Sequence, residues 1–305
     1  MEARMQAPPA LERTNPPQIS LPVYTGLALI FSFLWSTGFI AVAFALRSSP
    51  PLFMMAVRFI LAGAILLLIV ALMGRPLPRN WRDLGRLTIL GIFSFALFFG
   101  LTGVALTGIA AGTGAVLAST NPLMLALVAP FLLGERFSPL KLVGMLIAFS
   151  SVIVMMSSRI GIGDSPLHMG LVLLANAAMV TGTILFKRWA LPYDLAGMTA
   201  IQLLVGGLVL IGPSLLFEPI NTVVFDLNFF LTLAYMCIVL SWVTMLLYMF
   251  LVRSADASRA NTFLFLNPVF GLGLGALILG EPLGLMDFVG TLGVAFGIWL
   301  VLRSR

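Results

Sequence analysis

The sequence predicts an all-α polytopic membrane protein, with ten transmembrane helices arranged as two inverted five-helix repeats. Of its 305 residues, 60% are hydrophobic and 9% are charged, whereas roughly a quarter of the residues in a soluble domain are charged. The chain contains ten apolar runs, each close to the roughly 20 residues that cross a bilayer core. Asn121-Pro122 and Gly134-Glu135 recur as Asn267-Pro268 and Gly280-Glu281, 146 positions later. A repeat within apolar sequence indicates two duplicated bundles.

Proline, glycine and polar residues separate most of the ten runs, because these residues break helices. The separating turns are Ser49-Pro50-Pro51, Gly74-Arg75-Pro76, Ser138-Pro139, Gly161 to Pro166, Leu191-Pro192, Glu218-Pro219 and Glu281-Pro282. The boundary at 107–110 has almost no polar marker. The expected helices, in chain order, are 22–46, 51–73, 86–106, 110–133, 138–157, 168–189, 194–217, 228–252, 257–279 and 284–302.

We divide the chain into a tail and two repeats. Residues 1–20 are polar and rich in proline, with too little apolar surface to fold alone, so we expect a disordered cytoplasmic tail. Residues 21–157 form the first repeat and residues 158–305 the second. The segment Ala43-Phe44-Ala45 resembles a signal cleavage site, but the apolar run before it is too long for a signal core. We therefore expect this apolar run to remain in the protein as the first membrane helix.

The basic residues predict the orientation in the membrane. With the N-terminus in the cytoplasm, fourteen of the seventeen basic residues fall on the cytoplasmic side. Arg47 and Arg159 fall on the other side, and Arg58 lies inside the second helix. The positive-inside rule therefore places both termini in the cytoplasm. Because five helices per repeat is an odd number, the second repeat must enter the membrane upside down relative to the first.

The composition excludes several classes of protein. The chain has one cysteine, Cys237, and one histidine, His168, so no internal disulfide or multi-histidine metal site can form. No G-x-S-x-G nucleophile motif occurs. The net charge of +6 comes from basic residues in short loops between the apolar runs. A nucleic-acid-binding protein would instead gather them in a basic patch with interleaved aromatic residues. We expect no enzymatic activity, no metal, no cofactor and no nucleic-acid partner.

The repeated stretches resemble a known family. Residues 105–156 and 251–302 are similar to the two copies of the EamA domain, which places the chain in the drug/metabolite transporter superfamily. Leu34-Trp35-Ser36 and Arg58-Phe59 resemble the start of the same domain. The resemblance covers about residues 22–302 and is specific for the superfamily but not for a solute.

The resemblance implies a ten-helix bundle around a central cavity, lined mainly by helices 1, 3, 4, 6, 8 and 9. It also implies a bacterial inner-membrane protein that exports amino acids or other small metabolites, with the solute and membrane lipid as its partners. Helices 5 and 10 are peripheral in that arrangement. Their small residues suit close packing within the chain or in a homodimer formed through these helices. These residues are Gly144, Ala148, Gly290, Gly293 and Gly297.

Polar and aromatic side chains near the middle of the membrane are the candidate solute contacts, because a buried polar group needs a partner. Ser241, Thr244 and Tyr248 have the i, i+3 and i+7 spacing of one polar stripe. The alternatives are hydroxyl bonds to the local helix backbone and, for the tryptophans, core packing. The full candidate set is Trp35, Ser36, Asn121, Asn176, Ser241, Trp242, Thr244, Tyr248 and Asn267.

Two prolines are the predicted hinges. Pro122 and Pro268 remove the helical hydrogen bonds to the carbonyls of Ala118 and Leu264, so each should bend its helix near the bilayer centre. Either the solute, internal water or a neighbouring helix can satisfy the freed carbonyls. As a pair of inverted bends, the prolines would allow either mouth of the bundle to open.

The charged residues within the membrane bear on the solute. Arg58 could bind a carboxylate of the solute, but we favour an arginine that extends to the outer surface; its counterpart in the second repeat is Gln202. We expect the Gly134-Glu135 and Gly280-Glu281 pairs to end helices and bond turns. No carboxylate lies near mid-membrane, which disfavours proton coupling and cation export.

The sequence therefore predicts facilitated export or exchange of neutral or zwitterionic metabolites by alternating access, most plausibly of amino acids or related compounds. Two alternatives remain open. One is efflux of drugs or toxic compounds, and the other is a membrane scaffold or pore that does not transport by alternating access.

Overall fold

The computed structural model describes residues 19–109, 111–136, 138–157, 163–279 and 283–304. The predicted tail therefore lies almost wholly outside the described residues, and so do Gly280 and Glu281. Within the described residues, ten helical segments are long and apolar enough to cross a membrane, which confirms the predicted number.

Seven α-helices form the simpler spans or parts of them: α1 (Leu21–Ala45), α2 (Pro51–Leu72), α7 (Pro139–Met156), α8 (Pro166–Trp189), α9 (Leu195–Phe217), α14 (Leu285–Arg303) and α3 (Trp81–Gly91). Helix α3 starts earlier than the expected residue 86, because Asn80 caps its N-terminus and accepts a hydrogen bond from Asp83 N. The third span then continues through a π-helical segment, Ile92–Leu97, into α4 (Phe98–Ala105).

Besides the third, three further spans are interrupted near their centres. The fourth comprises α5 (Ala111–Ala118) and α6 (Thr120–Leu133), with Ser119 between them. The ninth comprises α12 (Ala257–Thr262), a 3₁₀ turn at Phe263–Phe265, α13 (Leu266–Leu274) and a π-helical segment at Gly275–Leu279. Both breaks lie just before a predicted hinge proline, as expected from its missing N–H. The eighth comprises α10 (Leu227–Tyr235), a π-helical segment at Met236–Thr244 and α11 (Met245–Ser254).

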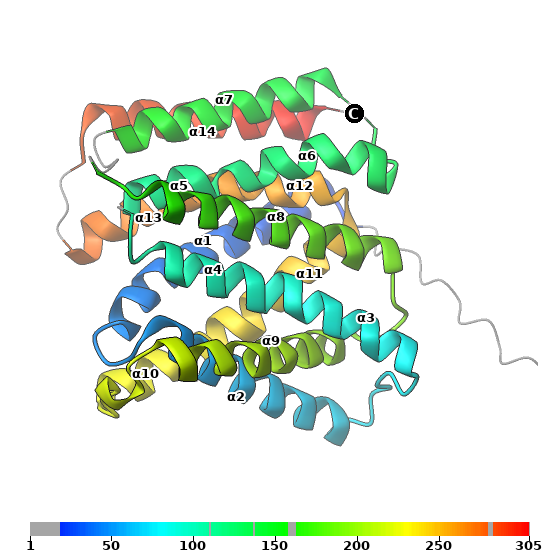
Figure 1. Ribbon diagram of the computed structural model, residues 1–305. Coiled ribbons are helices and arrows are strands. Elements are labelled where there is room, and N and C mark those ends of the chain that lie inside the picture. Colours follow the sequence, from blue (N-terminus) through cyan, green and yellow to red (C-terminus); the bar gives the residue numbers. More distant parts are fainter. Residues whose placement is uncertain (1–18, 110, 137, 158–162, 280–282, 305) are drawn as a thin grey trace, which may run out of the picture.

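The two repeats form equivalent helix pairs along opposite edges of the bundle (Figure 1). Helix α2 packs against α9 along one edge and α7 packs against α14 along the other. A Cβ atom on Gly63 of α2 would lie 2.6 Å from Leu204 N, and one on Gly207 of α9 would lie 2.7 Å from Ile60 N. These reciprocal contacts between corresponding glycines are what an inverted repeat produces across a pseudo-twofold axis.

The glycines of α7 and α14 make the same kind of contact. A Cβ on Gly144 would lie 2.7 Å from Gly297 O, and one on Gly290 would lie 2.8 Å from Ser151 O. The small residues of these peripheral helices therefore serve close packing within the chain. The homodimer stays a prediction, and it would have to use the outward faces of these helices.

Polar contacts gather at the two ends of the bundle. We call one the basic end, where Arg75 pairs with Asp194 at 2.6 Å and Lys141 pairs with Glu135 at 3.3 Å. At the opposite end, the carboxylate of Glu218 after α9 accepts hydrogen bonds from the backbone N–H groups of Leu52 and Phe53 at 2.7 and 2.8 Å. An anion at the first turn of α2 satisfies N–H groups that the helix itself leaves free.

Candidate functional site

A cavity of about 340 Å³ lies between the two repeats. Seven of the ten spans contribute to its wall, namely spans 1, 2, 3, 4, 6, 8 and 9. Its wall is mostly apolar, which suits a small organic solute held by a few polar groups. The polar and aromatic side chains of the wall are Trp35, Arg58, Phe98, Phe99, Thr102, Ser119, Asn121, Asn176, Thr244 and Asn267.

The cavity extends from the middle of the bundle toward the opposite end. Its wall includes Leu46, Leu106 and Ile109, which follow the ends of α1 and α4, and Val172 near the start of α8. Leu46 is 48% exposed. No residue from the described turns at the basic end contributes to this wall. Among the described residues, the cavity wall therefore extends toward the opposite end of the bundle and not toward the basic end.

Five of the nine predicted solute contacts line the cavity: Trp35, Asn121, Asn176, Thr244 and Asn267. The other four are absent from the wall and bond to protein groups, which for Ser36 include the backbone of its own helix. Ser36 Oγ donates to Ser32 O and Asn267 O, Ser241 Oγ accepts from Arg58 Nε, and Trp242 Nε1 donates to Ala62 O of α2. Tyr248 bonds to Thr183 and Asn261.

The expected stripe of Ser241, Thr244 and Tyr248 is thus not a single face toward the cavity. Thr244 Oγ1 donates to Val239 O, five residues back, inside the π-helical segment. A π-helix has more residues per turn than an α-helix, so the i, i+3, i+7 spacing no longer places side chains on one face. The sequence pattern assumed a regular α-helix throughout this span.

A chain of hydrogen bonds joins the two repeats next to the cavity. Thr183 Oγ1 bonds to Tyr248 OH at 2.9 Å, Tyr248 donates to Asn261 Oδ1 at 2.8 Å, and Asn261 Nδ2 donates to Asn121 Oδ1 at 2.8 Å. These four residues are at least 96% buried. Side-chain networks that are fully bonded make a buried polar region rigid. This network links spans of both repeats on the side of the cavity that faces the basic end.

Each helix break is bonded by the first span of the other repeat. Asn176 Nδ2 of α8 donates to Leu117 O at 2.8 Å and to Ala118 O at 3.5 Å. In the other repeat, Ser32 Oγ of α1 donates to Phe263 O at 2.8 Å. The carbonyl of Ala118 that Pro122 leaves free thus has a partner on a neighbouring helix. The hinge role of Pro122 and Pro268 stays a prediction.

Arg58 is the residue that the sequence reasoning misplaced. Its side chain does not extend to the outer surface; the residue is 2% exposed and lines the cavity. Nε donates to Ser241 Oγ at 2.8 Å, and the guanidinium carbon lies 4.9 Å and 5.6 Å from the ring centres of Phe59 and Phe99. The available signal was a charged side chain well inside a span, which by default marks a functional site.

Asn267 has an unpaired amide oxygen beside the same cavity. The residue lines the wall and is 8% exposed, and its Oδ1 atom is buried without a hydrogen-bond partner within the described structure. Buried side-chain oxygens are normally bonded, so this oxygen is an exception. Among the described residues, the wall thus combines one cation, Arg58, with the amide of Asn267.

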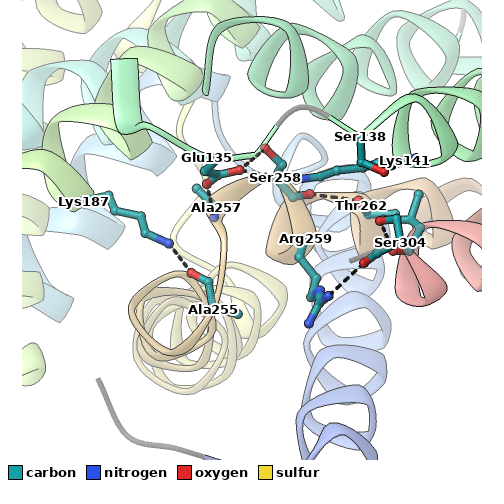
Figure 2. Close-up of polar contacts among 11 residues, drawn as sticks. Glu135, Ser138, Lys141, Lys187, Ala255, Ala257, Ser258, Arg259, Thr262 and Ser304 are labelled. Atoms are coloured by element: carbon teal, nitrogen blue, oxygen red, sulfur yellow. Dashed lines mark hydrogen bonds and ion pairs between the residues drawn. The ribbon is translucent and has the colours of Figure 1, made fainter. Parts of the chain in front are cut away.

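At the basic end, Glu135 joins the two repeats. Gly134, just before it, ends α6 with a φ of 67°, in the left-handed conformation that suits glycine. Glu135 then reaches the start of α12 in the other repeat (Figure 2), where its carboxylate accepts from Ala257 N at 2.7 Å and from Ser258 Oγ at 2.5 Å. We call this the Glu135 latch. The turn-bonding role expected for Glu135 is therefore a bond between repeats.

The latch holds a charged carboxylate. Burial raises the pKa of Glu135, but the hydrogen bond from Ser258, the charges of Lys141 and Lys187, and the N–H of Ala257 lower it more. The net result is a pKa below the ordinary value for a glutamate. Lys187 also donates to Ala255 O beside the latch (Figure 2).

Known proteins share this architecture. The chain is 29% identical over 287 residues to the Escherichia coli (strain K12) protein named "Uncharacterized inner membrane transporter YedA", covering 93% of this chain and 92% of that protein. It is 27% identical to an "Uncharacterized transporter" of Archaeoglobus fulgidus, covering 92% and 98%. One crystal structure, 18% identical and covering 92% of this chain and 98% of its own, superposes with a TM-score of 0.78 and so shares the fold.

The family comparison agrees with the internal repeat. The model of the EamA-like transporter family matches the chain twice, at residues 24–157 and 167–303. The two matches correspond to the two five-helix units whose inverted packing surrounds the cavity. With ten apolar spans, two matching repeats and relatives aligned over nearly the whole chain, the protein belongs to the EamA-like transporter family.

Proposed function

We propose that this protein is an inner-membrane exporter of small metabolites, with amino acids and related zwitterionic or neutral compounds as the leading solutes. One observation carries the proposal: the cavity opens toward one end of the bundle, while bonds between the two repeats close the other end. Inverted repeats can adopt the mirrored arrangement, in which the open and closed ends exchange. Alternating access follows from the exchange of these two states.

The positive-inside rule indicates which end of the bundle faces the cytoplasm. Arg75, Lys141, Lys187 and Arg253 all lie at the basic end, so this end should face the cytoplasm. The described arrangement then corresponds to an outward-open carrier. An inner-membrane location is further supported by the name of the Escherichia coli relative.

Counterflow in liposomes tests the proposal. Purified protein in vesicles loaded with unlabelled leucine should accumulate radiolabelled leucine from outside, and this uptake should saturate with concentration. Continuous ion conductance in a planar bilayer would instead identify a pore. Exchange of drug-like cations without exchange of any amino acid would favour toxic-compound efflux. The absence of all exchange would contradict the carrier mechanism.

Transport should not depend on pH near neutrality. A depressed pKa in the closed state means that the Glu135 latch is ionised at neutral pH, and it loses its stabilising charge only as the pH falls through that low value. When the latch opens, the pKa returns toward the ordinary value of about 4.3, so the carboxylate stays ionised. Leucine counterflow rates should therefore be flat between about pH 6 and pH 8. A steep change across this range, or a need for a proton gradient, would contradict facilitated exchange.

Replacing Glu135 with glutamine should open the basic end more often. Glutamine keeps the shape but loses charge-assisted hydrogen bonds, each worth about 1.5–3 kcal/mol. The measurement is maleimide labelling of Ala260→Cys, a position that is 1% exposed on α12, in a Cys237→Ala background. We expect labelling about tenfold faster, since about 1.4 kcal/mol changes an equilibrium tenfold.

The matched control is Glu218→Gln at the opposite end. This glutamate also binds the N-terminus of a helix in the other repeat, through Leu52 N and Phe53 N. Its replacement should not accelerate labelling of Ala260→Cys. Equal acceleration by both substitutions would show general loosening rather than opening of the basic end.

A further inference from the structure

Arg58 is a buried cation for which the described structure provides no anion. The three ion pairs among the described residues join Arg75, Arg86 and Lys141 to carboxylates, and none involves Arg58. None of the described residues in the cavity wall carries a carboxylate. Burial of an unpaired charge is costly, and charged side chains inside membrane spans usually face a cavity and pair with a functional partner.

The arginine is held in place but still has donors to offer. Nε donates to Ser241, and the contact from Nη1 to the sulfur of Met55, at 3.6 Å, is weak. A guanidinium has five N–H groups, and its planar fork matches the two oxygens of a carboxylate. The rings of Phe59 and Phe99 lie beside this group. Together with the bond to Ser241, they hold the guanidinium at the cavity wall before a ligand arrives.

We propose that Arg58 binds the carboxylate of the transported solute. The inference rests on the proposed function and deepens it by naming the group that the cavity recognises. The required class is a small monocarboxylate with an apolar body, because Trp35, Phe98 and Phe99 form an aromatic part of the same wall. The Asn267 amide, which belongs to a residue of the same wall, is the group assigned to an amino group on the solute.

A phosphate ester shares the anionic chemistry but fits less well. Arg58 is the only Lys or Arg in the cavity wall of the described residues. One carboxylate neutralises one guanidinium, whereas a phosphate dianion would leave a net negative charge in an apolar cavity. The charge balance therefore favours the carboxylate.

Four probes of similar size separate these chemistries by direct binding to detergent-purified protein. They are L-leucine, 4-methylpentanoate, which lacks the amino group, leucinamide, which lacks the carboxylate, and isoamyl phosphate. The wild type should bind leucine and 4-methylpentanoate but not leucinamide. Binding of leucinamide as tight as that of leucine, or a preference for isoamyl phosphate, would overturn the carboxylate assignment without any mutation.

Substitutions then assign the carboxylate to Arg58. Arg58→Gln introduces the residue type of its counterpart Gln202. It should lower the affinity for leucine and for 4-methylpentanoate at least about 30-fold, because removing one partner of a buried charge pair has an effect of this size. Arg58→Lys keeps the charge but loses the fork and should show an intermediate loss. Unchanged carboxylate affinity in both monodisperse variants would refute the proposal.

Two further variants separate recognition from architecture. Ser241→Ala removes the partner of Nε and leaves the cation, so it should retain most carboxylate binding; a loss as large as that of Arg58→Gln would mean that Arg58 only joins two helices. Asn267→Leu should lower the affinity for leucine but not for 4-methylpentanoate, which lacks the amino group. If the wild type exchanges leucine and Arg58→Gln exchanges it equally well, only this inference fails. If the wild type neither binds nor exchanges any probe, the proposed function fails with it.

Discussion

Replacing Gly207 with leucine should prevent α2 from packing against α9. A Cβ atom at this position would lie 2.7 Å from Ile60 N and 2.8 Å from Ala56 O, which are backbone atoms of α2. Backbone cannot move aside as a flexible side chain can, so the two helices must separate. Overpacking usually costs about 1–3 kcal/mol, and we expect at least the upper value here. Thermal unfolding of the purified protein in detergent measures the loss.

Gly212→Leu is the matched control for this substitution. It lies on the same helix, and nothing lies within 4 Å of a Cβ atom at its position. Gly212→Leu should leave the unfolding midpoint unchanged or raise it, because leucine has a higher helix propensity than glycine. Equal destabilisation by both substitutions would contradict the close contact between α2 and α9.

Replacing Asn176 with leucine should both destabilise the protein and impair exchange. Asn176 Nδ2 donates to Leu117 O and to Thr120 Oγ1 at 2.8 and 3.0 Å, within the break between α5 and α6. Leucine is similar in size but donates no hydrogen bond. Leu117 O keeps its bond from Thr120 Oγ1, whereas Ala118 O and Thr120 Oγ1 lose the donor that Asn176 supplied, at about 1–3 kcal/mol for each unsatisfied group. We expect a loss of about 2 kcal/mol or more in unfolding free energy, measured by thermal unfolding in detergent.

The same substitution removes an amide from the cavity wall, since Asn176 lines it. Leucine counterflow should fall about tenfold or more, because misplacement of the α5 and α6 halves alters the cavity. Thr181→Val is the control on the same helix: Thr181 Oγ1 donates only to Ala177 O of its own helix. Normal exchange by Asn176→Leu would show that the break in span four does not shape the solute site.

The broken helices of the two repeats are held in corresponding ways. Asn176 of α8 bonds the broken helix of the first repeat, and Ser32 of α1 bonds the broken helix of the second. The two breaks are bonded unequally. The amide of Asn176 donates to several acceptors at the first break, whereas the hydroxyl of Ser32 donates one hydrogen bond at the second. If the prolines act as hinges, the second repeat should bend more easily than the first.

Much of the fold could be predicted from local sequence. The ten spans follow from apolar length, and the breaks in spans four and nine lie just before Pro122 and Pro268, each of which removes a helical donor. A proline alone does not fix a break, because Pro130 and Pro213 lie inside continuous helices. The inversion follows from an odd number of spans per repeat. The α-helical spacing failed only where π-helical segments change the period, as between Ser241 and Tyr248.

The site was less predictable, because a sequence pattern gives the face of a helix but not what that face meets. Depth in the membrane selected Asn121 and Asn267, and the structure places both in the cavity wall; their role as solute contacts stays a prediction. It could not show that Trp242 bonds to α2, or that Arg58 turns inward to Ser241 instead of extending to the surface. These outcomes depend on neighbours more than 100 positions away.

The sequence by itself determined the membrane spans and the duplication, and it predicted bends at Pro122 and Pro268, since composition, repeat and proline act locally. The interruption of the eighth span was visible only in the structure. Only the tertiary structure decided which polar groups share a cavity, that Glu135 bonds the other repeat, and that Arg58 lacks an anion. The physical reason is that burial and pairing are properties of contacts between distant segments. A side chain acquires its partner, or remains without one, only when the two repeats pack together.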